Sequence, residues 1–162
     1  MICNTKRRIT GEAGISAING NKESKVLYSL SDPDSYRGKN LIVVGGGNSA
    51  VEAAVDLIAK REGSRITPRP HGEINNVTLL VRSYLAPTVK FGNKYQLYQM
   101  FDSGILDVQF GVAIKEMRET EVVLMNVRTK EEIGVVPNDY IFALIGGERP
   151  DRFLKSIGIE IA

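Results

Sequence analysis

The strongest apolar run of the chain lies near residue 40. Leu41 to Val44 is short, fully apolar and rich in β-branched residues, a pattern typical of a parallel strand buried on both faces. Three glycines follow directly. From Asn48 to Ile58 apolar residues then recur at helical spacing, which predicts an amphipathic helix ending near Lys60. The sequence therefore predicts a strand, a glycine turn and a helix without a gap.

Further apolar segments predict the rest of a sheet. A polar stretch from Arg61 to Asn76 is expected to be a loop. After it the expected elements are a strand at 77–81, a helix at 95–103, a strand at 105–110, three short strands at 113–117, 121–127 and 132–136, and a last strand at 140–145. This order favours a three-layer, Rossmann-like α/β domain with a mostly parallel sheet and a small antiparallel β-meander.

Composition narrows the class of protein. The 162 residues, 43% hydrophobic and 25% charged, suit one packed domain, and a net charge of +2 gives no reason to expect nucleic acid or a membrane as partner. The single cysteine, Cys3, has no companions for a disulfide or a metal site, so no metal is predicted. No apolar run is long enough to span a bilayer, and a soluble, cytoplasmic protein is expected.

The pattern Gly45-x-Gly47-x-x-Ala50 lies between the first predicted strand and helix. Gly45 permits a tight turn, Gly47 puts no side chain between the backbone and a pyrophosphate, and Ala50 lets the helix lie close to the sheet. The helix N-terminus adds free N–H groups and partial positive charge. The pattern predicts a dinucleotide site, and the flanking elements disfavour a merely flexible turn.

The second predicted strand ends in a cation. NAD-binding folds place an acidic residue there to bind the adenosine ribose, whereas this chain has Arg82 and Ser83, followed by Lys90 and Lys94. A cation and a hydroxyl suit the additional 2′-phosphate of NADPH, so NADPH is predicted in preference to NADH. Arg82 could instead be a solvated arginine at a strand end.

The remaining polar candidates have weaker signals. Ser49 and Glu52 have the spacing of a helix capping box. Arg65, Arg69 and His71, in the polar stretch, are expected to be solvated surface residues. No side chain is a convincing general acid, base or nucleophile, so no catalytic residue is predicted.

Two segments together resemble a known family. RGKNLIVVGGGNSAVEAA, residues 37–54, resembles the start of the NADPH-binding domain of thioredoxin-reductase-like flavoproteins, and DYIFALIGGERPDRFLKSIGIEI, residues 139–161, resembles the segment where those chains leave it. In such enzymes this domain is inserted into an FAD domain. The resemblance implies a linker over 1–36, an NAD(P)H-binding domain over 37–146 and a return linker over 147–162.

The resemblance also implies a function and a set of binding residues. The domain would present the nicotinamide of NADPH for hydride transfer to FAD, which the FAD domain of the same parent chain, and not this part, would hold. A homodimer is left open. The implied cofactor-binding residues are Gly45, Gly46, Gly47, Asn48, Ser49 and Ala50 at the pyrophosphate, Glu52 near the nicotinamide half, Arg82 and Ser83 at the 2′-phosphate, and Gly146, with Gly147 less specifically, at the end of the last strand.

Two departures limit the resemblance. Residues 28–36 contain no redox cysteine pair, so the chain is not a low-molecular-weight thioredoxin reductase, and nothing before Asn40 has the form of an FAD-binding glycine motif. Ferredoxin reductase-like, disulfide reductase-like and flavin monooxygenase-like parents all stay open. So does a regulatory nucleotide-binding module. A separate Rossmann methyltransferase or dehydrogenase is disfavoured, because the acidic or Tyr/Lys site residues that such enzymes usually have are not evident here.

Overall fold

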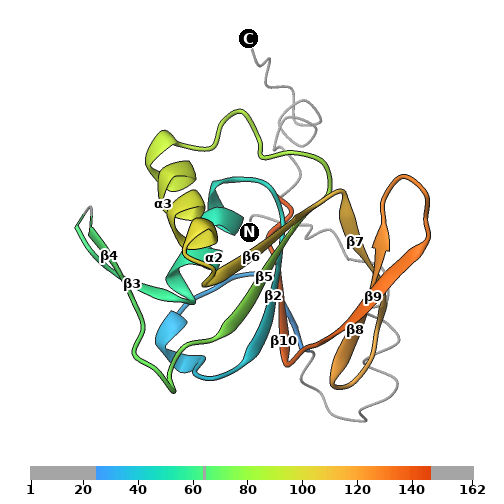
Figure 1. Cartoon of the computed structure of the whole chain (residues 1–162), viewed down its shortest axis with the longest axis horizontal. Coiled ribbons are helices and arrows are strands. Elements are labelled where there is room, and N and C mark those ends of the chain that lie inside the picture. The colour runs from blue at the N-terminus through green and yellow to red at the C-terminus, as the bar shows by residue number, and fades with distance from the viewer. Residues whose placement is uncertain (1–24, 64, 147–162) are drawn as a thin grey trace, which may run out of the picture.

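A five-stranded parallel sheet forms the centre of the molecule (Figure 1). The structure, a computed structural model, describes residues 25–63 and 65–146. In spatial order the strands are β1 (Val26–Leu27), β10 (Tyr140–Ala143), β2 (Asn40–Val44), β5 (Asn76–Val81) and β6 (Leu106–Phe110). Each neighbouring pair is parallel. The predicted Rossmann-like α/β class is thereby confirmed.

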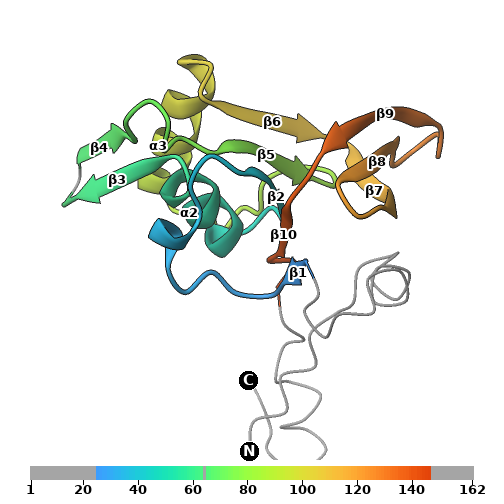
Figure 2. The ribbon, with the colours of Figure 1, turned by 90° about the horizontal axis from the view of Figure 1, so that it is seen from below.

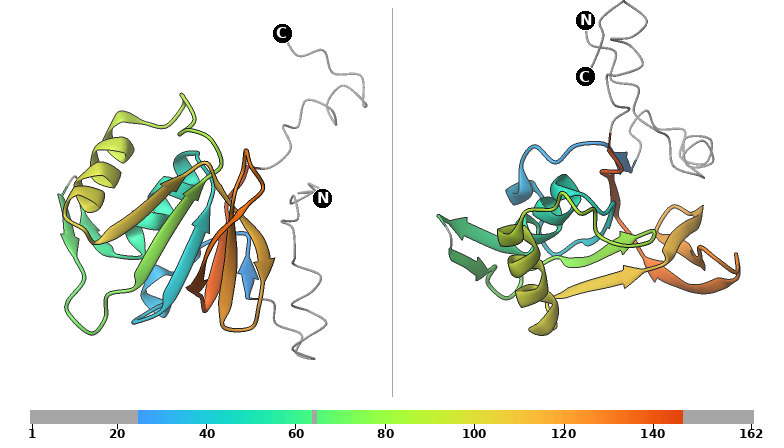
Figure 3. Two further views of the ribbon diagram at one scale, coloured as in Figure 1. Left: turned by 45° about the vertical axis from the view of Figure 1, so that its right-hand side comes forward. Right: turned by 90° about the horizontal axis from the view of Figure 1, so that it is seen from above.

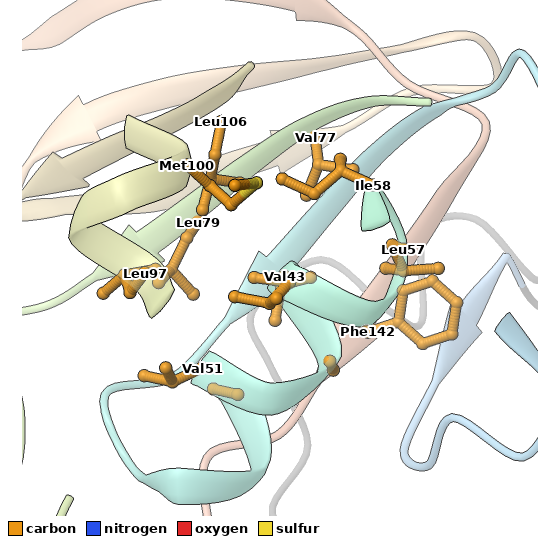
Figure 4. Packing of buried hydrophobic residues seen from close by; sticks show 14 of the residues in the cluster. Val43, Val51, Leu57, Ile58, Val77, Leu79, Leu97, Met100, Leu106 and Phe142 are labelled. Atoms are coloured by element: carbon orange, nitrogen blue, oxygen red, sulfur yellow. The ribbon is translucent and has the colours of Figure 1, made fainter. Parts of the chain in front are cut away.

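Two helices cover one face of this sheet, α2 (Asn48–Asp56) and α3 (Phe91–Asp102). Alternate residues of each strand point toward them, as the pleat requires, so Leu41 and Val43 of β2 share a core with α2. Figure 4 shows Val51 from α2 and Leu97 from α3 in the same cluster. These buried contacts fix the start of α2 above the end of β2.

A three-stranded antiparallel meander covers the other face (Figure 3). It comprises β7 (Val112–Met117), β8 (Glu121–Asn126) and β9 (Glu132–Pro137). The alternate residues of the central sheet, such as Ile42 and Leu80, pack there against Val122 and Leu124 of β8. The antiparallel meander predicted from the sequence is present, and the structure shows that it forms the third layer of the domain.

The described part of the predicted N-terminal linker packs onto the sheet (Figure 2). β1 pairs with β10, and the short 3₁₀ helix η1 (Pro33–Ser35) leads toward β2. Tyr36 makes edge-to-face contacts with Tyr140 and Phe142 of β10, with ring centroids 5.4 and 5.1 Å apart. Residues 25–36 thus complete one edge of the central layer.

The polar stretch after α2 is a β-hairpin and not the predicted loop. The helix ends at Asp56, earlier than the predicted end, and β3 (Ala59–Glu62) pairs antiparallel with β4 (Arg65–Pro68). Gly63, with φ of 65°, begins the turn, a conformation that favours glycine. Leu57 and Ile58 lie beyond the end of the helix but are fully buried. Because their spacing continues the apolar pattern of the helix, the sequence predicts a helix that is too long.

Arg69, just after this hairpin, is buried rather than solvated, with 6% of its surface exposed. Its guanidinium pairs with the carboxylate of Asp34 and donates to the Asp56 carbonyl oxygen at 3.0 Å. The hydrogen bond and charge of Arg69 lower the pKa of Asp34 below its ordinary value. The expectation of a surface arginine was wrong because sequence does not reveal that η1 and the end of α2 converge on Arg69.

We predict that Arg69→Met destabilises the fold by about 2–3 kcal/mol, because the Asp56 carbonyl loses the charged donor that the buried guanidinium supplies. Urea denaturation measures the change. Arg65→Met is the matched control: Arg65 is exposed on the same hairpin, and its loss should change stability by about 0.5 kcal/mol or less.

The pH dependence follows from the direction of the Asp34 shift. A carboxylate whose folded pKa is depressed stabilises the fold above its unfolded pKa of about 4, and this contribution disappears as pH falls through the folded value. The stability difference between the wild type and Arg69→Met should therefore narrow as the solution is acidified below about pH 4. A difference that stays constant to pH 2 contradicts the assigned pairing.

Candidate dinucleotide-binding site

The order of the parallel strands marks where a ligand binds. From β2 the chain proceeds outward through β5 to β6, and then returns to place β10 on the opposite side of β2. In open α/β sheets such a reversal leaves a crevice at the carboxyl ends of the two central strands. Here that point is bordered by the Gly45–Gly47 turn after β2 and by residues 144–146 after β10.

A cleft of about 670 Å³ opens at this point. It extends from the glycine turn and the first residues of α2 to the loop after β5 on one side and the end of β10 on the other. Its lining residues are Tyr28, Gly46, Gly47, Asn48, Ser49, Ser83, Tyr84, Ala86, Pro87, Ala143, Leu144, Ile145 and Gly146. We call it the first cleft.

A second cleft of about 580 Å³ adjoins the first and shares Gly46, Ser83, Tyr84 and Ile145 with it. It lies between the parallel sheet and the meander. Its other lining residues are Val44, Gly45, Leu80, Val81, Arg82, Val112, Ala113, Ile114, Met125, Val127 and Lys130. Both clefts therefore adjoin the carboxyl ends of β2, β5 and β10.

Gly45 is required by the backbone itself. Its φ of 149° is a conformation that L side chains rarely adopt. A Cβ here would collide with the carbonyl oxygen of Leu144 and would lie 2.9 Å from the Cβ of Ala50. Ala50 is fully buried, so the small residues at both positions let α2, β2 and β10 approach closely.

Gly47 has the opposite environment. It is the N-cap of α2, its backbone is extended, and a Cβ added there would meet nothing within 4 Å. No side chain caps the helix, and the first N–H groups of a helix have no acceptor inside it. The open space at Gly47 therefore faces unpaired donors and the positive end of the helix dipole, the arrangement that binds phosphate.

The side chain of Asn48 holds the loop after β5 against the glycine turn. Its Nδ2 donates to the Thr88 carbonyl at 3.0 Å, and its Oδ1 accepts from the Lys90 backbone N–H at 2.9 Å and from Asn93 Nδ2 at 3.0 Å. The backbone N–H of Ala86 also donates to the Gly46 carbonyl at 2.7 Å. One wall of the first cleft is thereby fixed to its floor.

The predicted capping box is absent. The N-cap is Gly47, so Ser49 lies inside the first turn and cannot cap it, and the Glu52 carboxylate does not reach back to the N-terminus. Instead Glu52 Oε1 accepts a hydrogen bond of 2.8 Å from Asn93 on α3. The spacing matched a capping box by coincidence, because the helix begins two residues earlier than a serine cap requires.

The structure brings together eight of the ten residues predicted to bind the cofactor. They line the two clefts: Gly45, Gly46, Gly47, Asn48, Ser49, Arg82, Ser83 and Gly146. Ala50 and Glu52 line neither cleft, since Ala50 packs against Gly45 and Glu52 bonds to Asn93. Gly147 lies outside the described residues.

Several residues that line the clefts were not predicted as binding residues from the sequence. Tyr84, 71% exposed, borders both clefts, and its position directly after Ser83 was the available signal. Tyr28 and Lys130 come from distant parts of the chain, and nothing in their local sequence connects them to the glycine turn. In the helix expected at 95–103, the sequence is most simply interpreted with Tyr95 and Phe101 in the core, whereas both are exposed on α3.

Three further features concern His71, metal ligands and membrane-spanning helices. His71 is exposed in a turn, as expected. Among residues 25–63 and 65–146, no group of three or more His, Cys, Asp or Glu side chains is arranged to hold a metal ion. Over the same residues no helix is long and apolar enough to cross a membrane.

The strand order, the glycine turn and the meander define a Rossmann-like α/β domain of the kind found in nucleotide-dependent enzymes. The chain belongs to the pyridine nucleotide-disulphide oxidoreductase family, whose model matches residues 11–162. This is a family of flavin-dependent oxidoreductases, and the resemblance to thioredoxin-reductase-like flavoproteins is confirmed.

Individual relatives agree with this family. The bacilliredoxin reductase Bdr of Bacillus subtilis is 27% identical over 144 residues, which cover 89% of this chain and 40% of the relative. Among solved structures, the bacillithiol disulfide reductase Bdr (YpdA) from Staphylococcus aureus has a TM-score of 0.70 at 24% identity, covering 96% of this chain and 42% of that one. The thioredoxin reductase of T. acidophilum has a TM-score of 0.64 at 20% identity, covering 98% and 46%.

The two structural likenesses establish the shared fold, and the chain spans about two fifths of the length of the curated relative described above.

We predict that two glycine substitutions in the turn differ strongly in how much they destabilise the domain. Gly45→Ala should destabilise the domain by about 2–4 kcal/mol, since the added methyl collides with the β10 backbone. Gly47→Val should cost about 1 kcal/mol or less, because its side chain enters open space at an N-cap position. Chemical denaturation of both variants measures the contrast, and equal losses would contradict the assigned packing.

Proposed function

We propose that this domain binds NADPH across the two clefts and presents its nicotinamide for hydride transfer to an FAD held by another domain of the parent protein. The observation that carries the proposal is the glycine turn at the strand reversal, with open space at Gly47 in front of the first turn of α2. The membership of the chain in a flavin-dependent family supplies the reaction class.

In this proposal the pyrophosphate lies over Gly46 and Gly47. The backbone can approach it closely because neither residue has a side chain, and the N–H groups of Asn48 and Ser49 begin α2 beside it. Asn48 acts there through its backbone, since its side chain is already bonded to Thr88, Lys90 and Asn93. Its side chain positions the wall of the cleft.

The 2′-phosphate of NADPH is assigned to the end of β5. Arg82 is exposed and lines the second cleft, and within the described residues it forms no ion pair. A guanidinium that is exposed and not held by a carboxylate can donate hydrogen bonds to a phosphate without first breaking an ion pair. Ser83 borders both clefts and adds a hydroxyl at the same place.

The nicotinamide half would then occupy the first cleft beyond the glycine turn. There the end of β10, including Gly146, meets Tyr28 and the loop containing Pro87. NADPH supplies the hydride, and the domain supplies binding, orientation and exclusion of water along one face of the ring. Glu52 contributes indirectly, because it holds Asn93, which in turn contacts Asn48.

We predict that the chain binds NADPH about tenfold to a hundredfold more tightly than NADH, the range for one charged hydrogen-bonding contact. Arg82→Ala should remove most of this difference, and Gly47→Val should abolish the binding of both. Isothermal titration calorimetry with each dinucleotide measures these affinities. Equal affinities for NADPH and NADH in the wild type contradict the assignment of Arg82, and unchanged affinity in Gly47→Val contradicts the assignment of the glycine turn.

We also predict that the purified 162-residue chain is colourless and oxidises NADPH negligibly without an added flavoprotein. The Gly45–Gly47 turn is assigned to NADPH, and a bound donor without a bound acceptor loses the rate advantage of proximity. An absorbance scan followed by an NADPH oxidation assay checks both points. Flavin bands near stoichiometric occupancy would reassign the Gly45–Ala50 turn to FAD.

A further inference from the structure

The second cleft contains a cation that the glycine turn and β5 do not provide. Lys130 lines it from the turn between β8 and β9, on the meander, while Arg82 lines it from the end of β5 in the central sheet. We propose that Lys130 is a specificity-determining residue that binds the 2′-phosphate of NADPH together with Arg82. This inference rests on the proposed function and adds the meander to the binding site.

The charge of the second cleft favours an anion. Among the residues that the structure describes, Arg82 and Lys130 are the charged residues that line it, and none of the acidic residues does. Within the described residues neither cation forms an ion pair, whereas Lys115, on the same meander, pairs with Glu132 at 3.2 Å. A ligand phosphate would therefore neutralise both charges without displacing a protein carboxylate.

The remaining lining of this cleft suits an aromatic base. The meander contributes an apolar wall of five residues, Val112, Ala113, Ile114, Met125 and Val127. Apolar surface beside two cations matches the chemistry of adenosine 2′-phosphate, in which a flat ring system lies next to a dianion. Pyrophosphate is assigned to the adjoining glycine turn, so the second cleft is where the phosphorylated ribose would lie.

Hydrogen bonds to and from Asn126 hold the turn that contains Lys130. Asn126 Oδ1 accepts hydrogen bonds from the backbone N–H groups of Arg128 and Thr129, at 2.9 and 3.1 Å. The Lys130 N–H donates to the Asn126 carbonyl at 2.9 Å, and the Asn126 N–H donates to the Glu131 carbonyl at 2.9 Å. The backbone position from which the lysine side chain extends is thereby fixed.

The backbone conformation of Lys130 argues for a binding role of its side chain over a structural role. Its φ is 65°, and among the described residues it is the one non-glycine residue with positive φ. Glycine adopts this conformation without the steric cost that lysine incurs. A turn that had only to close would therefore be at least as stable with glycine, so the backbone alone gives no reason for lysine at this position, and the proposed phosphate contact supplies one.

The test uses Lys130→Gly, which keeps the backbone conformation and removes the charge. We expect NADPH affinity to fall about fivefold to tenfold by calorimetry, with NADH affinity within about twofold of wild type. The unfolding temperature should stay the same or rise, because the steric cost is removed. Lys130→Arg should retain most of the affinity, and Lys115→Gly, on the same meander, should leave the NADPH to NADH ratio unchanged.

Adenosine 2′,5′-bisphosphate and ADP serve as a second probe pair, since they differ at the ribose 2′ position and need neither nicotinamide nor flavin. Lys130→Gly should weaken the first selectively. The inference is overturned if NADPH affinity stays within about twofold of wild type, or if NADPH and NADH affinities fall together. If the wild type prefers NADPH but Lys130→Gly has no effect, this inference alone fails, whereas a wild type that binds neither dinucleotide overturns the proposed function as well.

Discussion

The site depends on one close approach of three backbone segments at Gly45. β2 ends one residue before it, α2 begins three residues after it, and the carbonyl of Leu144 after β10 occupies the space that a side chain would need. Because Ala50 is also small, the start of α2 can lie directly above the parallel sheet. The helix terminus, the strand reversal and both clefts are brought to one place by this single contact.

Features encoded by local pattern could be predicted from the sequence. The run Leu41–Val44 indicated a buried strand because an all-apolar segment suits a layer covered on both faces, and the structure places it between α2 and the meander. The glycine turn was recognisable because strand, glycines and helix follow without interruption. Arg82 and Ser83 could be assigned to a strand end for the same reason.

Features that depend on distant partners could not be predicted. The burial of Arg69 depends on its ion pair with Asp34. Asn48 lies at the centre of a hydrogen-bond network whose other members, Thr88, Lys90 and Asn93, are about forty positions away in the sequence. The hairpin after α2 was missed because Leu57 and Ile58 are buried in either conformation, so hydrophobic periodicity alone could not show where the helix ends. Lys130 had no local signal, since its turn meets the cleft only once the meander has folded over the sheet.

The position of β10 has a consequence for biosynthesis. This strand lies between β1 and β2, and its residues are translated roughly a hundred positions after β2, so the sheet stays incomplete until most of the domain has been synthesised. Until then the edge of β2, with Ile42 and Val43, has unpaired backbone groups on an apolar strand, the kind of surface that associates with other chains. The meander pairs only neighbouring segments and can form first. The nascent chain therefore has a period of aggregation risk that ends when β10 inserts between β1 and β2.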